Sequence, residues 1–417
     1  MNTESDTAST GIGRDRSVGL TDIVTADVDQ LVDPVDPVDH DSVGGDPIGY
    51  ADPTGTTAPW WRRLLRQQEV WGVVAIVALL CVNLIKDPGY LSISYSSNTG
   101  AFVGNVIDIL RASAPILMIA IGMCLVIATS GIDLSVGSMM AVSGAVAMEF
   151  MNGRPDTLGA AVGAIALALG LCLVLGAFSG VLISVVGLQP FITTLVMMLA
   201  GRGIAKVITS GQNTTADNES YRWLSNGYVF GLPVVFLIAV GITVLVIVLV
   251  RKSALGMMIE SLGINAEASR LAGINRRALL TTVYTVSAVL AGVAGILATG
   301  TVMTVDISQT GYQLELDAIL AVVVGGTSLA GGKFSLTGAA IGAVLIATLD
   351  KTVVFLGVPA SATPAFKAIV IIVLYVAQAD NTRSALARFR RTPDHHTSDT
   401  QTPGSATTGA HTSRAAS

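Results

Sequence analysis

An uncharged stretch of 45 residues, from Thr157 to Gly201, limits what this 417-residue chain can fold into. As a single α-helix it would be about 68 Å long, whereas the hydrocarbon core of a bilayer is about 30 Å thick. Soluble domains rarely contain such a run, because about a quarter of their residues are charged. The stretch therefore predicts two membrane-spanning helices, separated at GLQP (187–190), where glycine and proline interrupt the helix.

The composition extends this prediction to most of the chain. Hydrophobic residues make up 51% of the sequence and charged residues only 13%. We therefore expect an all-α integral membrane protein, since helices satisfy their own backbone groups in lipid. Apolar windows with at most one charged residue predict about ten transmembrane helices. Two lie within 157–201, and the others lie near 70–85, 112–130, 134–151, 231–250, 278–300, 316–330, 335–350 and 365–379.

The two ends of the chain differ from this apolar centre. Residues 1–58 contain twelve Asp and Glu residues and few apolar groups, so they cannot bury enough surface to fold alone. We predict a disordered acidic N-terminal tail over 1–58, a transmembrane domain over 59–380 and a disordered C-terminal tail over 381–417.

The loops predict an orientation, because Lys and Arg accumulate on the cytoplasmic side of membrane proteins. With ten spans, thirteen basic loop residues fall on one face and five on the other. This distribution predicts a multi-pass protein of the cell membrane with both termini in the cytoplasm. The loop 251–278 is then cytoplasmic as well.

Within this loop, INAEASRLAG predicts a helix of about three turns with an apolar face and a charged face. Asn265 is the expected N-cap, Glu267 lies in the first turn, Arg270 in the last, and Gly273 ends the helix. Such a helix either connects two spans along the membrane surface or contacts a partner protein.

The chain resembles the membrane permease subunits of sugar ABC importers, which include the ribose, galactose, galactofuranose and fructose permeases. The resemblance covers roughly residues 65–380. Its ending, LDKTVVFLGVPASATPAFKAIVIIVLYVAQ, most resembles the galactofuranose and fructose members, so fructose or another furanose-type sugar is expected first, with ribose, xylose and galactose still open. Four motifs carry the resemblance: SGIDLSVGSMMAVSG (130–144), TLVMMLAGRGIA (194–205), ESLGINAEASRLAGIN (260–275) and ELDAILAVVVGGTSLAGGKFSLTGA (315–339).

The resemblance implies the ABC importer permease fold and a transport subunit that is not itself an enzyme and holds no cofactor or metal. ATP and Mg would be used by separate ATPase subunits. The other implied partners are a second permease chain, identical or related, and an extracytoplasmic sugar-binding protein, with no role for nucleic acid. The implied ATPase-coupling residues are Gly263, Asn265, Glu267, Arg270 and Gly273.

Ionisable residues inside the predicted spans have two interpretations each. Asp133 either lines the sugar pathway or caps a helix beginning at residue 134. Arg202 either extends its charge to the outer interface or contacts sugar hydroxyls or an acid such as Glu315 or Asp317. Glu315 either lines an outer vestibule or stabilises a helix N-terminus.

The stretch VVVGGTSLAGGKFSLTG (322–338) has some features of a phosphate-binding loop, but the motif G-x-x-x-x-G-K-[ST] fails at Thr327 and Phe334. We predict instead a tight cytoplasmic turn with Lys333 at the membrane interface. The alternative function is an ion-coupled secondary sugar carrier or a channel without an ATPase partner. Such carriers usually use intramembrane acids as relays, and this sequence has few of them.

Overall fold

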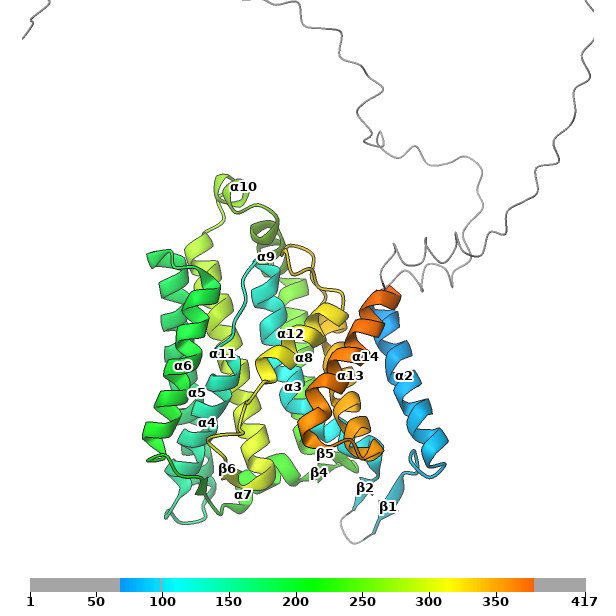
Figure 1. Cartoon of the computed structure of the whole chain (residues 1–417). Coiled ribbons are helices and arrows are strands. Elements are labelled where there is room, and N and C mark those ends of the chain that lie inside the picture. Colours follow the sequence, from blue (N-terminus) through cyan, green and yellow to red (C-terminus); the bar gives the residue numbers. More distant parts are fainter. Residues whose placement is uncertain (1–67, 98–99, 379–417) are drawn as a thin grey trace, which may run out of the picture. The chain divides into compact units, whose positions relative to one another are not determined.

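The computed structural model describes residues 68–97 and 100–378, so the tails predicted over 1–58 and 381–417 lie outside the described residues. Figure 1 shows a helical bundle in which both described ends of the chain lie at the same end as α10. The helices are α2 (Gln68–Lys86), α3 (Asn105–Ala128), α4 (Val136–Met151), α5 (Leu158–Val181), the π-helix η2 (Leu182–Val186), α6 (Pro190–Ile208), α7 (Glu219–Asn226), α8 (Val234–Lys252), α9 (Leu255–Ile264), α10 (Ala266–Leu271), α11 (Arg276–Val302), α12 (Leu314–Val324), α13 (Leu336–Leu356), the 3-10 turn η3 (Ala360–Ala362) and α14 (Thr363–Gln378).

Six short strands form three antiparallel pairs at the end of the bundle opposite α10 (Figure 1). Each pair has only two or three residues per strand; β1–β2 and β4–β5 are hairpins, and β3–β6 joins the segments after α6 and α11. The pairs are β1 (Ser94–Ser96) with β2 (Ala101–Val103), β3 (Thr214–Thr215) with β6 (Thr304–Val305), and β4 (Tyr228–Val229) with β5 (Leu232–Pro233).

Each of the ten predicted spans corresponds to a helix, which confirms the all-α multipass membrane fold. Among the described residues, seven helices are long and apolar enough to cross a bilayer: α2, α3, α5 with η2, α6, α8, α11 and α13. The other three, α4, α12 and α14, have 16, 11 and 16 residues. The span predicted over 316–330 is wrong at its end, because α12 stops at Val324 and an irregular loop follows as far as Ser335.

The predicted break at 187–190 is confirmed. Gly187 adopts a φ of 83°, a left-handed conformation that ends the helix preceding it. Pro190 occupies the first turn of α6, where its missing N–H leaves no hydrogen bond unmade. Glycine and proline thus divide one apolar run into two antiparallel spans.

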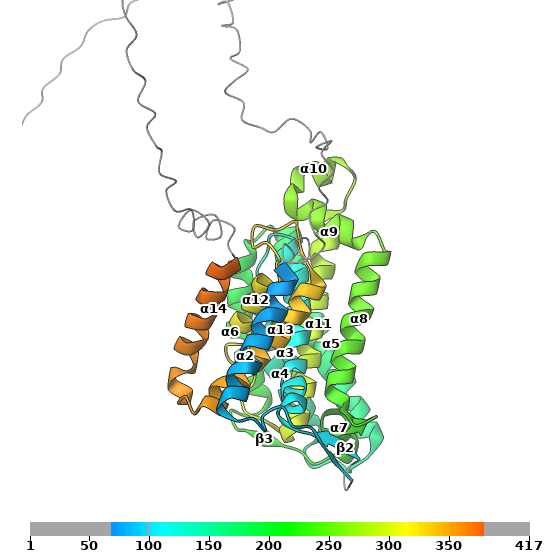
Figure 2. The same ribbon diagram turned by 90° about the vertical axis from the view of Figure 1, so that its right-hand side faces the viewer.

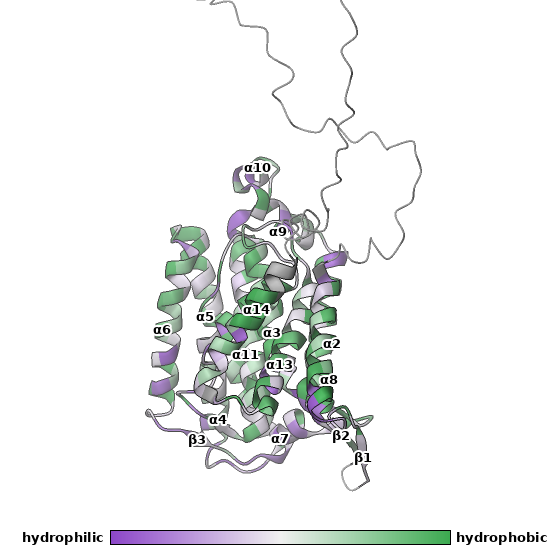
Figure 3. Cartoon of the chain, turned by 45° about the vertical axis from the view of Figure 1, so that its right-hand side comes forward, coloured by the Kyte–Doolittle hydropathy of each residue, from purple (hydrophilic) through white to green (hydrophobic). Residues whose placement is uncertain are grey.

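The bundle has a buried centre and an apolar outer surface. In α3 and α11, 78% and 67% of the most apolar window is buried, against 17% in α2 and 33% in α8. The exposed side chains of the peripheral helices are nevertheless largely apolar, and most of the ribbon of α2 is green in Figure 3. Exposed apolar side chains such as Val77, Leu173, Leu199 and Val248 therefore face hydrocarbon in a bilayer.

Two helices start within the bundle after the chain turns inward. Residues 129–135 lead from α3 to α4, and residues 306–313 lead from β6 to α12 (Figure 1). The two starts meet at Gly137 and Gly311, where a Cβ on either residue would overlap backbone of the other segment. Gly311 also has a φ of 72°, which favours glycine. The short length of α4 and α12 follows from these internal starts.

Close glycine contacts hold the helices together. Gly176 and Gly180 of α5 pack against α11, and a Cβ on Gly180 would lie 2.7 Å from the Thr281 Cα atom. Gly338 and Gly342 of α13 touch the backbone of α12. Helices in lipid associate through such close packing, because lipid tails are as apolar as the side chains and the hydrophobic effect does not drive the helices together.

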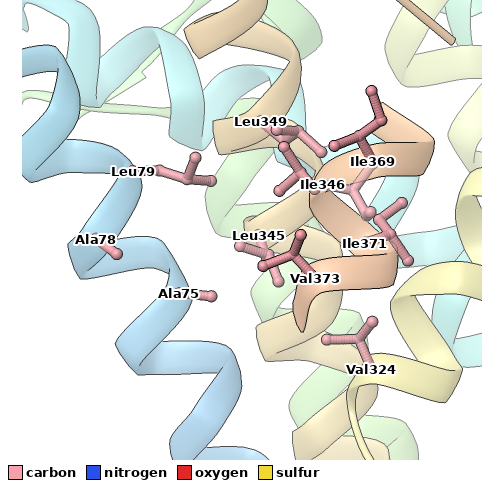
Figure 4. Close-up of a pocket in the computed structure, with 11 residues that line it drawn as sticks. Ala75, Ala78, Leu79, Val324, Leu345, Ile346, Leu349, Ile369, Ile371 and Val373 are labelled. Atoms are coloured by element: carbon pink, nitrogen blue, oxygen red, sulfur yellow. The ribbon is translucent and has the colours of Figure 1, made fainter. Parts of the chain in front are cut away.

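An apolar groove lies where α2, α13 and α14 face one another, as Figure 4 shows. Its volume is about 210 Å³, and all eleven lining residues are Ala, Val, Leu or Ile, including Ala75, Leu345 and Ile371. An aliphatic wall offers no hydrogen bonds to hydroxyl groups, so this groove suits hydrocarbon and not a polar solute.

The glycine contacts generate a stability prediction. Gly342→Ala should lower the melting temperature of the purified protein, because the new methyl group overlaps the Ala321 carbonyl oxygen and overpacking costs about 1–3 kcal/mol. Gly170→Ala is the matched control in α5, where a Cβ meets nothing within 4 Å and alanine should stabilise the helix slightly. Equal melting temperatures for the two variants would contradict this packing account.

Candidate functional site

The helix α10 projects beyond the ends of the surrounding helices at one end of the bundle (Figures 1 and 2), while α9 beneath it packs Ile259 and Leu262 into the core. The predicted helix of about three turns is shorter in the structure, since α10 has six residues. The preceding helix, α9, has ten residues and was not expected from the sequence. The segment is therefore two consecutive short helices instead of one surface helix, and α10 is the part that projects.

The sequence determines the bounds of α10 as predicted. The Asn265 side chain accepts hydrogen bonds from the N–H groups of Glu267 and Ala268, both at 3.0 Å, so it caps the helix. The Ser269 hydroxyl donates to the Asn265 carbonyl at 2.9 Å and braces the same turn. Gly273 follows with a φ of 84°, a conformation in which a side chain would be strained.

The surface of α10 is both charged and apolar. Arg270 Nε donates to both carboxylate oxygens of Glu267 at 3.1 Å, and the two side chains are 65% and 68% exposed. The Arg270 guanidinium lowers the pKa of the Glu267 carboxyl below its ordinary value by hydrogen bonding to the charged form. Beside this pair, Ile264 and Leu271 are 72% and 75% exposed. Apolar side chains displayed with a fixed ion pair are suited to contact with another protein.

Gly263, at the other end of this segment, lies against the bundle. A Cβ at this position would overlap the Ala128 carbonyl oxygen at the end of α3 and the Gly332 nitrogen in the α12–α13 loop. Gly263 therefore belongs to the base of the projection, whereas the other predicted coupling residues, 265–273, lie on α10 or at its ends.

Asp133 is 1% exposed and lies just before α4. Its Oδ1 atom accepts from the Ser135 N–H at 3.0 Å and the Ser135 hydroxyl at 2.6 Å, and its Oδ2 atom accepts from the Ser287 hydroxyl of α11 at 2.9 Å. The predicted cap of a helix beginning at 134 is not found in that form, because α4 begins at Val136 with Ser135 as its N-cap, and the carboxylate of Asp133 accepts the N–H of Ser135 just before the helix. Asp133 thereby ties the start of α4 to α11.

Arg202 and Glu315 lie close together beside the start of α12. Arg202 Nη1 donates to the Thr310 carbonyl at 2.6 Å, and its charge attracts the Glu315 carboxylate without an ion pair between them. The buried Oε2 atom of Glu315 has no hydrogen-bond partner in the structure. Gly137 of α4 faces this oxygen, since a Cβ there would overlap it. The structure thus places two of the three predicted pathway residues together, whereas the hydrogen bonds of Asp133 go to Ser135 and Ser287.

Sequence reasoning missed a charged cluster formed by α12, α13 and α14. Lys367 Nζ lies 2.9 Å from Asp317 Oδ2 and 2.6 Å from Asp350 Oδ1. Asp317 therefore pairs with Lys367 and not with Arg202, which had been one of its expected partners. The signal was one basic and two acidic residues inside apolar segments, because charges at membrane depth are costly unless they are paired.

The contacts of Asp133 generate a prediction about folding. Asp133→Ala should reduce yield and melting temperature, because it leaves a buried N–H and two hydroxyl groups without their acceptor, at about 1–3 kcal/mol. Asp133→Asn keeps one acceptor oxygen and should be affected less. Asp217→Ala is the control, since this aspartate is 86% exposed in a surface ion pair. A melting temperature for Asp133→Ala equal to that of the control would show that these bonds do not secure α4.

The comparisons with known proteins agree with this architecture. The family model described as the permease component of the branched-chain amino acid transport system matches residues 105–377. The chain is 52% identical to a fructose import permease of Bifidobacterium longum, over 79% of this chain and 93% of that protein. No solved structure matches the sequence significantly.

Two further relatives transport other sugars by name. A galactofuranose transporter permease of Escherichia coli is 37% identical, over 76% of this chain and 92% of the relative. A ribose import permease of the same species is 36% identical, over 73% of this chain and 91% of the relative. The chain belongs to the family of membrane permease subunits of monosaccharide ABC importers.

Proposed function

We propose that this chain is the permease subunit of an ATP-binding-cassette importer for a monosaccharide, with fructose as the first candidate. The observation that carries the proposal is the projecting α9–α10 segment, which presents a fixed ion pair and exposed apolar side chains to a partner. The 52% identity to a protein named as a fructose import permease supports the sugar. Ribose, xylose, galactose and other furanose-type sugars are the further candidates.

The energy source in this proposal is a separate ATPase subunit that uses ATP and Mg, while the permease chain hydrolyses nothing. The region that resembles a phosphate loop supports this division. Thr327 occupies the place of the required glycine, and its hydroxyl accepts the Ser335 N–H at 3.2 Å. Phe334 packs against the hydrophobic core where a magnesium-binding hydroxyl would be needed. The segment therefore serves as the connection between α12 and α13.

The proposed orientation puts α10 in the cytoplasm. Both described ends of the chain lie at the α10 end, and the basic residues of loop 251–278 favour that side (Figure 1). An extracytoplasmic sugar-binding protein then meets the opposite end, which carries α7 and the short strands. A second permease chain, identical or related, completes the pathway.

Within the membrane domain, we assign the pathway to the region where α4 and α12 begin. Arg202 and Glu315 supply hydrogen-bonding groups there, and the buried Oε2 atom of Glu315, which has no partner, becomes able to accept from a sugar hydroxyl when the starts of α4 and α12 separate. Asp133 supports this region by holding the start of α4 in place. Few such groups suit a pathway that binds sugar weakly, with recognition left to the binding protein.

A transport assay in membrane vesicles separates this proposal from a secondary carrier or a channel. Inside-out vesicles containing the permease and its ATPase should export labelled fructose from their lumen only when ATP and the binding protein are supplied, with ion gradients collapsed. Transport that continues without ATP would contradict the ATP-driven importer and favour the alternative.

The double variant Glu267→Ala with Arg270→Ala should release the ATPase during purification and reduce sugar uptake to about a tenth or less. The ion pair is exposed and touches no core residue, so the permease should keep its melting temperature. Asp217→Ala with Arg222→Ala removes a comparable exposed pair at the other end and should leave the ATPase bound. Full uptake by the α10 variant would show that the loop only connects two spans and does not contact the ATPase.

A further inference from the structure

Three segments meet directly beneath α10. They are the end of α3 with the turn that follows it (128–131), the junction of α9 and α10 (263–264), and part of the α12–α13 loop (330–332). The Ser130 hydroxyl lies 2.9 Å from the Gly263 carbonyl oxygen and 3.0 Å from the Ala330 carbonyl oxygen. The Gly332 N–H donates to the Ala128 carbonyl at 2.9 Å. We call this contact of the three segments the joint.

The joint is closely packed because glycine occupies each point of approach. A Cβ on Gly263 would overlap Ala128 and Gly332, and a Cβ on Gly331 would overlap the Ser130 hydroxyl. Gly331 and Gly332 also have φ angles of 90° and 78°. At Gly263 backbone therefore rests on backbone, whereas Gly331 and Gly332 face the side chains of Ser130 and Ile264.

Ser130 has two properties that suit a movable contact. Its hydroxyl has one proton to donate and faces two carbonyl oxygens, so it forms a full hydrogen bond with only one of them at a time. Its φ of 62° is uncommon for a residue other than glycine and directs the side chain between the two acceptors. A shift of the α9–α10 junction changes which acceptor is nearer.

The joint connects α10 with both helices that start inside the bundle. From Ser130 the chain runs through Asp133 into α4, and α12 leads into the loop that contains Ala330. The starts of α4 and α12 meet each other at Gly137 and Gly311. A displacement of α10 is therefore applied to the two segments whose far ends border the region of Arg202 and Glu315.

The geometry points to the joint as the element that transmits movement of α10 to α4 and α12, with Ser130 as the positioning residue that couples the segments. This inference rests on the proposed function and adds a specific route to it. A contact in which one hydroxyl can donate to either of two acceptors is the kind of element through which coupling between distant sites operates.

The test uses the complete importer, reconstituted with its ATPase and binding protein, and measures labelled fructose transported per ATP hydrolysed. Ser130→Gly removes the hydroxyl and relieves the backbone strain, whereas Ser130→Ala removes the hydroxyl and keeps the strain. Both variants should retain the bound ATPase and transport at least threefold less sugar per ATP than the unmodified importer. Ser261→Ala is the control, since that hydroxyl donates only within α9, to the Met257 carbonyl.

Three results would overturn the inference. If both Ser130 variants transport as much sugar per ATP as the unmodified importer, the hydroxyl has no role in coupling. A defect in Ser130→Ala that Ser130→Gly lacks would show that backbone strain at residue 130, and not loss of the hydroxyl, lowers the sugar transported per ATP. Loss of the ATPase from both variants would make the joint a docking scaffold. Failure of the unmodified complex to transport on ATP would instead count against the proposed function, so the two failures are distinguishable.

Discussion

Backbone N–H and C=O groups inside a bilayer must find partners within the protein, because hydrocarbon offers none. This constraint is severe where α4 and α12 begin inside the bundle, since the first N–H groups of a helix have no partner within it. The structure meets it with side chains and with close backbone contact. Asp133 accepts the Ser135 N–H before α4, and the segments around Gly137 and Gly311 lie against each other. The buried helices α3 and α11 keep lipid away from this irregular backbone.

The same internal starts give the permease a part that can change without unfolding. Long helices such as α5 and α8 are continuous and turn apolar faces outward, so they form a frame in lipid. The connections 129–135 and 325–335 are short, contain glycine and touch the base of α10. A partner protein that moves α10 therefore displaces the two connections directly and the long lipid-facing helices only indirectly. This arrangement agrees with a subunit that obtains its energy from a partner.

Much of the architecture follows from local sequence. Apolar windows with few charges locate the ten helices predicted as spans, Gly187 and Pro190 mark the break between two of them, and Asn265 with Gly273 marks the bounds of α10. The end of α12 was mispredicted because the stretch after Val324 remains uncharged as far as Lys333, and hydropathy does not register the glycine conformations that end the helix. Local signals such as caps and breaks depend on neighbouring residues, which the sequence displays.

The candidate site was predictable only in part. Its charged residues stand out in apolar segments, but their partners come from helices far apart in the chain. Lys367 meets Asp317 and Asp350 across three helices, and Ser287 lies 154 positions from Asp133. The contact of Ser130 with Gly263 likewise depends on how α9 returns to the end of α3. Pairings of this kind are set by tertiary packing and have no periodic signature.

The side of the membrane on which α10 lies is the most direct test of the account, because an ATPase can reach it only from the cytoplasm. Leu271→Cys and Phe230→Cys place thiols at the two ends of the bundle, at positions 75% and 93% exposed, after the exposed Cys81 is replaced by serine. A membrane-impermeant maleimide should label Phe230→Cys in intact cells and Leu271→Cys only in inside-out vesicles. Labelling of Leu271→Cys in intact cells would place the projection outside and contradict coupling to an ATPase.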